Sequence, residues 1–189
     1  MKRIFIYLTF VTVLFSACGE KNQNNKTSAK EPVSEEFHTG DIVFQESKSA
    51  QSKYIKQATG SRYTHCGIIV MINGEPHVLE AVSTVTLTPF EEWKNRGVDK
   101  HVLTIRCNEA DFNIDGNKYL GKRYDTEFKW DDRKMYCSEL VYKVYQDNGI
   151  NLGELHPVKD YNIEGMESYL KKRGISLDQL VIAPSDLIR

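Results

Sequence analysis

Cys137 stands at the front of the segment KMYCSELVYKVY (134–145), whose apolar residues recur with the spacing of one helix face. A thiol at the N-terminus of a helix lies at the positive end of the helix dipole, which lowers its pKa and favours the nucleophilic thiolate. Backbone N–H groups at the same helix start can stabilise an oxyanion. A buried core cysteine fits the same pattern, so the interpretation depends on whether the chain supplies a base.

His65 is the candidate base. A nucleophilic cysteine needs an imidazole within hydrogen-bond reach and a polar group that orients the imidazole. The chain has five histidines, and His65 is the one within an apolar strand pattern, YTHCGIIVMI (63–72). The next residue, Cys66, then points to the opposite face of the strand and is interpreted as a core residue.

Glu80 is the candidate orienting group. The dipeptide Asn73-Gly74 predicts a tight hairpin between the first strand and EPHVLEAV (75–82). In the register of a two-residue turn, His65 and Glu80 are diagonal neighbours on one face of the hairpin. Gly67, opposite Glu80, leaves space for the carboxylate to approach the imidazole.

The pattern therefore predicts a triad of Cys137, His65 and Glu80, in which the carboxylate fixes the tautomer of the imidazole. Each residue also has a structural interpretation. His65 alone is compatible with a partly buried polar residue, Glu80 with a charge at a strand end, and Cys137 with a core position.

The remaining elements mix strands and helices without a regular βαβ rhythm, which favours an α+β fold with an antiparallel sheet. Thr88 and Glu91 are expected to form a capping box around Pro89, and Ser47 or Ser49 is expected to cap an earlier helix. The expected strands are 40–46, 63–72, 75–82, 101–107 and a short one in LVIAPSDL (180–187); the expected helices are 47–60, 88–97, 108–120, 137–148 and 164–172.

The first residues have the pattern of an exported protein. Lys2 and Arg3 precede an apolar run of twelve (4–15), which is too short to span a bilayer comfortably. The run ends in Ser16-Ala17-Cys18, which resembles the lipobox of bacterial lipoproteins and implies that Cys18 is lipidated. The alternative is an ordinary secretory signal in which Cys18 is incidental.

Three parts of the chain follow from this interpretation. Residues 1–18 are expected to be a lipoprotein signal peptide, and the polar residues 19–37 a flexible tether that cannot bury enough apolar surface to fold. Residues 38–189 form the predicted catalytic domain. We thus expect a protein of the bacterial cell envelope, anchored through its lipid on the periplasmic or outer-membrane side.

The composition excludes some classes of function. The formal net charge is −1, so nothing favours binding to nucleic acid through charge. No cluster of His, Cys, Asp and Glu has the spacing of a metal site, and we expect no metal and no other cofactor. Besides Cys18 the chain has three cysteines, an odd number, so at least one thiol stays unpaired within the chain. A disulfide between Cys66 and Cys107 is possible, but the sequence does not decide whether it forms.

Five short segments, in this order, resemble the YiiX-type permuted papain-like enzymes, which are relatives of the NlpC cell-wall peptidases: GDIVF, THCGIIV, VLEA, GKRYDTEFKW and YCSELV. The resemblance runs from about residue 40 to 187. It implies a circularly permuted NlpC-like fold, with an antiparallel sheet packed against helices that include the nucleophile helix. By this resemblance Cys137 is the nucleophile, His65 the base, Glu80 the third member, and Tyr124 lines the substrate pocket, although an aromatic residue there also suits packing.

The expected function is that of an envelope-anchored cysteine hydrolase that cleaves amide bonds, peptide or amino-acyl, of cell-wall-derived peptides or other small molecules. The first alternative is a lipid-directed acyltransferase or thioesterase with the same triad. The second is a binding lipoprotein whose triad is silent. The expected partners are an amide substrate and the membrane, and the sequence leaves the oligomeric state open.

Overall fold

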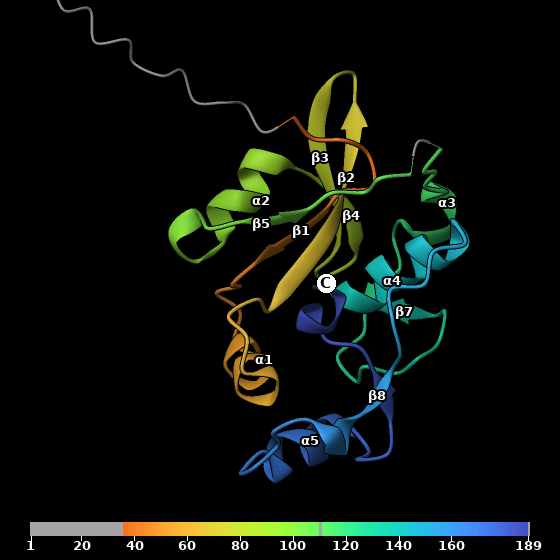
Figure 1. The fold of residues 1–189 in the computed structure, drawn as a ribbon. Coiled ribbons are helices and arrows are strands. Elements are labelled where there is room, and N and C mark those ends of the chain that lie inside the picture. The colour runs from red at the N-terminus through yellow and green to blue at the C-terminus, as the bar shows by residue number, and fades with distance from the viewer. Residues whose placement is uncertain (1–35, 110, 189) are drawn as a thin grey trace, which may run out of the picture. The chain divides into compact units, whose positions relative to one another are not determined.

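A five-stranded antiparallel sheet lies at the centre of the computed structural model, which describes residues 36–109 and 111–188 (Figure 1). Every neighbouring pair of strands in it is antiparallel. In spatial order the strands are β4 (Val85–Pro89), β3 (Glu75–Ala81), β2 (His65–Ile72), β1 (Ile42–Gln45) and β5 (Leu103–Ile105).

The predicted hairpin joins β2 to β3. Asn73 and Gly74 both have positive φ, 52° and 86°, as a tight two-residue hairpin turn requires. Ile72 pairs with Glu75, and the same register continues to the pairing of Ile68 with Leu79. The predicted register is confirmed.

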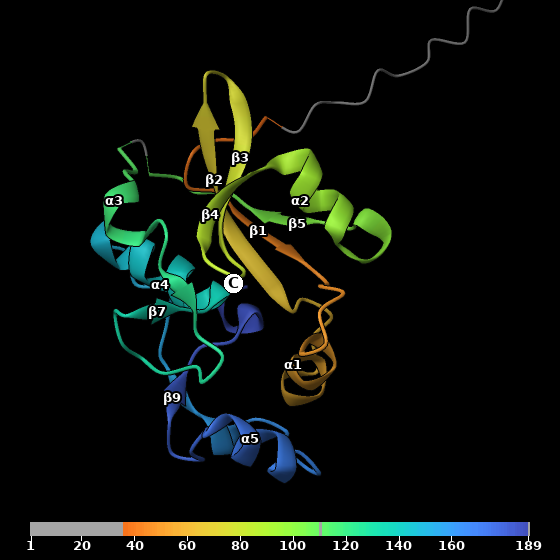
Figure 2. The ribbon, with the colours of Figure 1, turned by 180° about the vertical axis from the view of Figure 1, so that it is seen from behind.

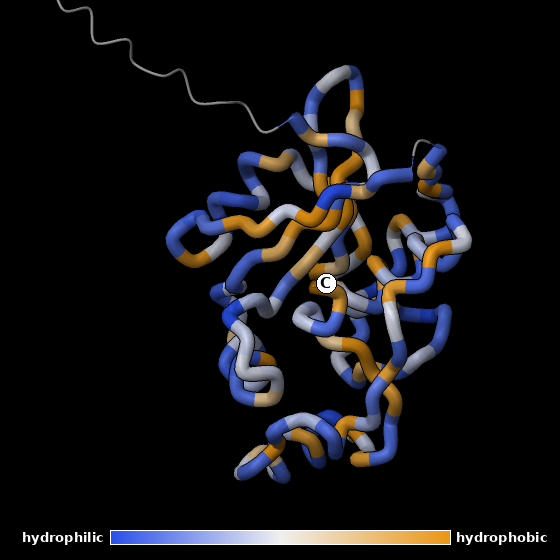
Figure 3. Tube along the Cα trace, viewed as in Figure 1, coloured by the Kyte–Doolittle hydropathy of each residue, from blue (hydrophilic) through white to orange (hydrophobic). Residues whose placement is uncertain are grey.

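The two faces of the sheet carry different layers, because successive side chains of a strand point to opposite sides. One face packs against α4 (Cys137–Asp147) and the other against α2 (Phe90–Arg96) (Figures 1 and 2). Figure 3 shows hydrophobic residues along the strands between these layers. The α4 side includes Ile42, Phe44, Cys66, Ile68, Leu79, Ala81, Leu140 and Val144; the α2 side is built from Val43, Ile69, Val78, Phe90 and Trp93.

Smaller elements surround the two layers. In both ribbon views α1 and α5 lie toward the end of the sheet that is away from the β2–β3 turn (Figures 1 and 2). Besides α2 and α4, the helices are α1 (Ser52–Thr59), α3 (Gly116–Tyr119) and α5 (Glu167–Arg173). The 3-10 turns are Val98–Lys100, Val158–Asp160 and Pro184–Leu187. Two short ladders are β6 (Arg123–Tyr124) with β7 (Lys134–Met135), which is parallel, and β8 (His156–Pro157) with β9 (Leu180–Val181), which is antiparallel.

Two predicted caps are wrong. Thr88 does not cap α2, because it belongs to β4, a strand that the sequence interpretation missed. Its segment, VTLTP, begins with the β-favouring residues Val and Thr and pairs along β3. Neither Ser47 nor Ser49 caps α1, which begins at Ser52 with Gln51 as its N-cap residue.

The helix expected over 108–120 is also wrong for most of its length, since α3 covers only Gly116–Tyr119. The segment is rich in Asn and Asp, whose side chains compete with the helix for backbone donors. Asp115 is the N-cap residue of α3, because its carboxylate accepts a hydrogen bond from the Asn117 N–H at 3.0 Å, and the helix therefore begins only at Gly116. The predicted C-terminal strand is reduced to Leu180–Val181.

The described part of the chain begins before the predicted domain boundary. Phe37, assigned above to the tether, packs against Phe90 with 4.5 Å between ring centroids. The predicted signal peptide, Cys18 and most of the tether lie outside the described residues. Within residues 36–109 and 111–188, none of the helices has the length and apolar character needed to cross a membrane.

Candidate active site

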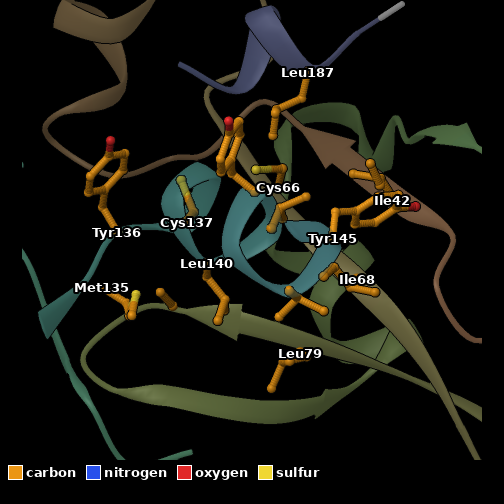
Figure 4. Close-up of a cluster of buried hydrophobic side chains, with 14 of the residues drawn as sticks. Ile42, Cys66, Ile68, Leu79, Met135, Tyr136, Cys137, Leu140, Tyr145 and Leu187 are labelled. Carbon is orange, nitrogen blue, oxygen red and sulfur yellow. The ribbon is translucent and has the colours of Figure 1, made fainter. Parts of the chain in front are cut away.

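Cys137 is the first residue of α4 and is nearly buried, with 3% of its surface exposed. Figure 4 shows its sulfur at the start of that helix, in the same buried cluster as Cys66. Glu139 holds the helix start, because its Oε2 accepts a hydrogen bond from the Tyr136 N–H at 3.3 Å. The thiol therefore lies at the positive end of the helix dipole.

His65 and Glu80 lie on one face of the hairpin, as predicted, and are in direct contact. His65 Nε2 is 2.7 Å from Glu80 Oε2, and the Glu80 side chain is fully buried. A carboxylate only accepts hydrogen bonds, so Nε2 carries the hydrogen and donates it. Nδ1 is then the nitrogen left for a second partner.

The Cys137 thiol also interacts with the His65 imidazole. Burial by itself lowers the pKa of His65, but interactions with Cys137 and Glu80 outweigh burial and raise the pKa to about 9. The imidazole is thus held as the imidazolium near neutral pH. The structure brings Cys137, His65 and Glu80 together.

Cys66 is a neighbour of the Cys137 thiol, a contact that the sequence interpretation did not anticipate. The Cys66 side chain is buried. Its hydrogen bond to Cys137 has the largest effect on the pKa of Cys137, and together with His65 it holds that pKa well below the usual range. Burial acts in the opposite direction and raises the pKa of Cys137. Burial and the negative charge of Cys137 raise the pKa of Cys66. One thiolate therefore forms, at Cys137, with Cys66 as a neutral donor to it.

Two further residues that the sequence interpretation missed hold Glu80. Thr88 Oγ1 donates a hydrogen bond to Glu80 Oε1 at 2.6 Å, and Arg96 forms an ion pair with the same oxygen. Burial raises the pKa of Glu80, but His65, Thr88 and Arg96 together lower it below its usual value. Alternation of Thr and apolar residues in VTLTP was the one available signal for a third strand beside Glu80.

Tyr124 ends β6 and lines the space beside the thiol. Its hydroxyl oxygen accepts a hydrogen bond from Gln51 Nε2 at 2.7 Å. Burial and the Cys137 charge raise the pKa of Tyr124 well above its usual value, so the phenol stays protonated. With its oxygen already used as an acceptor, its O–H remains available to donate.

Comparison with known proteins identifies the family. Residues 36–188 match the model of the permuted papain-like amidase enzymes, YaeF/YiiX, C92 family. The chain belongs to this family. It is therefore a cysteine hydrolase with a permuted papain-like α+β fold, as the sequence resemblance implied.

Two relatives of the C92 family are similar over most of the chain. The uncharacterized protein YiiX of Escherichia coli (strain K12) is 38% identical over 160 residues, which are 77% of this chain and 79% of that protein. The crystal structure of YiiX from Escherichia coli O157:H7 superposes with a TM-score of 0.70 at 37% identity, covering 79% of this chain and 90% of that one.

The O157:H7 relative is described as a metalloprotein. Among residues 36–109 and 111–188 of the present C92 enzyme, no group of three or more His, Cys, Asp or Glu side chains is arranged to hold a metal ion. The three cysteines in this part of the chain, Cys66, Cys107 and Cys137, are free thiols. The disulfide between Cys66 and Cys107, which the sequence left undecided, is therefore not formed. The residues that the structure describes therefore do not fit a metal centre.

Two recesses of different character meet at the site of this C92 enzyme. The apolar recess, about 100 Å³, is lined by Cys137 and side chains from α1, α5 and the C-terminal segment. The second, more polar recess, about 580 Å³, is lined by His65, Arg96, Lys48 and further polar side chains, together with Ala81 and Val82. Tyr124 lines both. Cys137 and His65 thus face different surroundings.

Proposed function

We propose that the protein is a cysteine amidase of the bacterial cell envelope, with Cys137 as nucleophile, His65 as base and Glu80 as the orienting carboxylate. The observation that carries this proposal is the 2.7 Å contact between His65 Nε2 and Glu80 Oε2, beside a thiol whose pKa is lowered. The amidase chemistry of the C92 family agrees with these roles. We infer that peptide or amino-acyl bonds, including those of cell-wall-derived peptides, are the bonds cleaved.

The reaction follows from the paired charges of the thiolate and the imidazolium. The Cys137 thiolate attacks the amide carbonyl carbon and forms a C–S bond; His65 then gives its proton to the departing amine as the C–N bond breaks. Water attacks the resulting thioester, His65 accepts a proton from that water, and the carboxylic acid product leaves while the thiolate is restored.

Two donors suit the oxyanion of the tetrahedral intermediate. The first N–H groups of α4 have no partner within the helix and point toward its N-terminal end, where Cys137 lies. The Tyr124 hydroxyl is a second donor. Its oxygen accepts a hydrogen bond from the Gln51 amide, so its own O–H is free to donate to the oxyanion. We assign Tyr124 to substrate binding for this reason.

Acyl-directed chemistry is the second candidate. The same three side chains would form a thioester from an ester or another thioester, and the apolar recess beside Cys137 suits a lipid-derived acyl group. This candidate differs from the first in the leaving group, an alcohol or thiol in place of an amine.

The test is an assay of the full chain in mild detergent against a panel of peptide amides, acyl esters and phospholipids, with release of amine and of acid measured separately. We expect amine release that Cys137→Ala abolishes and that His65→Ala lowers by about 10²- to 10⁴-fold. Cys107→Ala is the matched control and keeps the wild-type rate. Wild-type turnover by His65→Ala would remove the base assignment, and turnover of lipid alone would replace the amidase by the acyl-directed enzyme.

A further inference from the structure

The polar recess beside His65 carries charges of only one sign. Its lining includes the cationic side chains of Lys48 and Arg96, and among the described residues that line it there is no Asp or Glu. Another charged recess, of about 310 Å³, is lined by acidic and basic side chains together, and these pair with one another, as Asp131 does with Arg133 at 2.9 Å. The polar recess therefore differs in presenting positive charge without acidic side chains at its surface.

Arg96 is held beside the proposed base. Its guanidinium pairs with Glu80 Oε1, while His65 Nε2 lies 2.7 Å from Oε2 of the same carboxylate. The two oxygens belong to one carbon atom, so the guanidinium and the imidazole are neighbours. Glu80 is fully buried, whereas 42% of the Arg96 side chain is exposed. Because a guanidinium has five N–H donors, Arg96 retains donors for a ligand in the recess.

Lys48 is the second cation of the recess. It is exposed, in the segment that follows β1, and within residues 36–109 and 111–188 it has no ion-pair partner. The acidic residue of the same segment, Glu46, is engaged by Lys56 at 2.6 Å. The ammonium group of Lys48 is therefore available to an anion.

Gln45 adds a buried polar group to the same lining. Its surface is only 3% exposed, and its Oε1 has no hydrogen-bond partner in the part of the chain that the structure describes. Buried polar atoms are nearly always partnered, so this unused acceptor suits a ligand that donates an N–H. The lining thus combines cations for an acidic group with an acceptor for an N–H group.

The chemistry of the proposed triad decides which half of a substrate enters the polar recess. His65 gives its proton to the departing amine, and His65 lines this recess. The amine half of the substrate therefore lies on the side of the site where Lys48 and Arg96 are found.

We propose that the polar recess is an anion-binding subsite for the leaving amine, and that the substrates are amides whose amine half carries an acidic group. The proposal rests on the proposed function, because it uses the role of His65. Lys48 and Arg96 bind the acidic group and so determine specificity. Carboxylate and phosphoryl groups share this chemistry, and matched substrates distinguish them.

Octanoyl amides that differ only in the amine half test the subsite. The amines are glycine, its uncharged counterpart glycinamide and aminomethylphosphonic acid, with 4-aminobutanoate and 4-aminobutanamide as a longer pair. The full chain is assayed in a mild neutral detergent, and amine release gives kcat/KM. We expect the carboxylate or the phosphonate to be cleaved about tenfold faster than the matching carboxamide, because charge-assisted hydrogen bonds are the stronger ones. Whichever of the two acids is cleaved faster identifies the acidic group.

Lys48 is the residue to vary, because Arg96 also holds Glu80. Lys48→Met should lower the ratio of acidic to neutral substrate about threefold, Lys48→Glu should bring the ratio to one or below, and Lys48→Arg should keep it. Lys53→Glu, exposed on α1 and outside the recess, is the matched control and should keep the wild-type ratio. Each ratio compares two substrates on one variant, so a loss of folded protein cancels.

The outcomes separate the two proposals. Equal cleavage of acidic and neutral substrates by the wild-type chain, or an unchanged ratio in Lys48→Glu, would overturn the anion-binding subsite. The proposed function then still stands, provided that Cys137→Ala abolishes the cleavage. If the wild-type chain releases amine from none of these amides nor from the peptide amides, the proposed function fails, and the subsite fails with it.

Discussion

Cys137 and Cys66 are both buried thiols, but their pKa values are shifted in opposite directions, because only one of the two can carry a negative charge. The helix start and His65 favour the charge on Cys137, and Cys66 then serves as a neutral donor to that sulfur. The arrangement gives the proposed nucleophile, Cys137, two interacting neighbours in a buried region. A sulfur stabilised in this way stays ionised below the pH at which free thiols ionise.

Selective alkylation tests this difference between thiols. Because the pKa of Cys137 is lowered, a larger share of its thiol is ionised at mildly acidic pH than of an ordinary thiol. We expect iodoacetamide at pH 6 to modify Cys137 at least about tenfold faster than Cys107, as measured by peptide mass spectrometry. His65→Ala should raise the Cys137 pKa and slow its modification. Equal rates at Cys137 and Cys107 in the wild-type chain would favour the silent binding lipoprotein.

The pH dependence of turnover gives a second test at this scale. The pKa of His65 is about 9 in the folded protein, against 6.5 for a free imidazole, so the imidazolium that protonates the leaving amine is present below pH 9 and lost above it. We expect kcat/KM to decline as the pH rises through about 9. Glu80→Gln removes the carboxylate that raises this pKa, so the decline should begin at lower pH. A decline that stays near pH 9 in Glu80→Gln would contradict the assigned contact.

At the scale of elements, three segments converge on one carboxylate. β3 carries Glu80, β4 brings the Thr88 hydroxyl to it, and α2 supplies Arg96. The ring of Trp93, also from α2, lies 6.1 Å from the imidazole of His65 between centroids. The face of the sheet that α2 covers therefore has a role in holding the base as well as in packing.

Thr88 is expected to act as a positioning residue. Thr88→Val keeps the shape of the side chain and removes the hydrogen bond to Glu80, which costs about 1 kcal/mol or somewhat more because the acceptor is charged. We expect kcat to fall about three- to tenfold with KM little changed, and Thr88→Ser to restore most of the loss. Steady-state kinetics with a soluble amide measures both values. Equal losses in kcat for Thr88→Ser and Thr88→Val would assign Thr88 a packing role instead.

The sequence predicted those parts of the site that depend on local pattern. The Asn73-Gly74 turn fixes the register of β2 and β3, and this register alone places His65 beside Glu80. Gly67 was expected to leave room for the carboxylate, and an added Cβ there would lie 2.8 Å from the Leu79 carbonyl oxygen, so the close approach involves the backbone of β3 as well.

The missed parts depend on contacts between distant elements. Thr88 followed by Pro89 satisfies the local pattern of a helix cap, and only pairing with β3 makes it a strand residue. Cys66 points away from His65 along β2, as the strand period requires. It is nevertheless next to Cys137, because α4 packs on that face of the sheet, and strand periodicity carries no information on where a helix from residues 137–147 will start.

At the scale of the whole molecule, the proposed catalytic groups are divided between two structural layers. The proposed base, His65, and its carboxylate, Glu80, belong to the sheet, and the proposed nucleophile, Cys137, belongs to the helix packed on one of its faces. The site exists only when α4 and the sheet are assembled. All of its proposed residues lie within the span 36–188 that matches the C92 family, which separates the chemistry from the N-terminal segment.

This separation makes the proposed lipid anchor testable independently of catalysis. When the full chain is expressed in a bacterium fed an alkyne-bearing fatty acid, we expect the protein to become labelled through Cys18. Cys18→Ser should abolish the label, and Cys107→Ser is the matched control that keeps it. A chain that begins at residue 36 should remain unlabelled and cleave a soluble amide at the rate of the full chain, because the residues that form the site are retained. Labelling of Cys18→Ser at the wild-type level would refute the lipobox interpretation, and loss of activity on truncation would show that the preceding residues contribute to the enzyme.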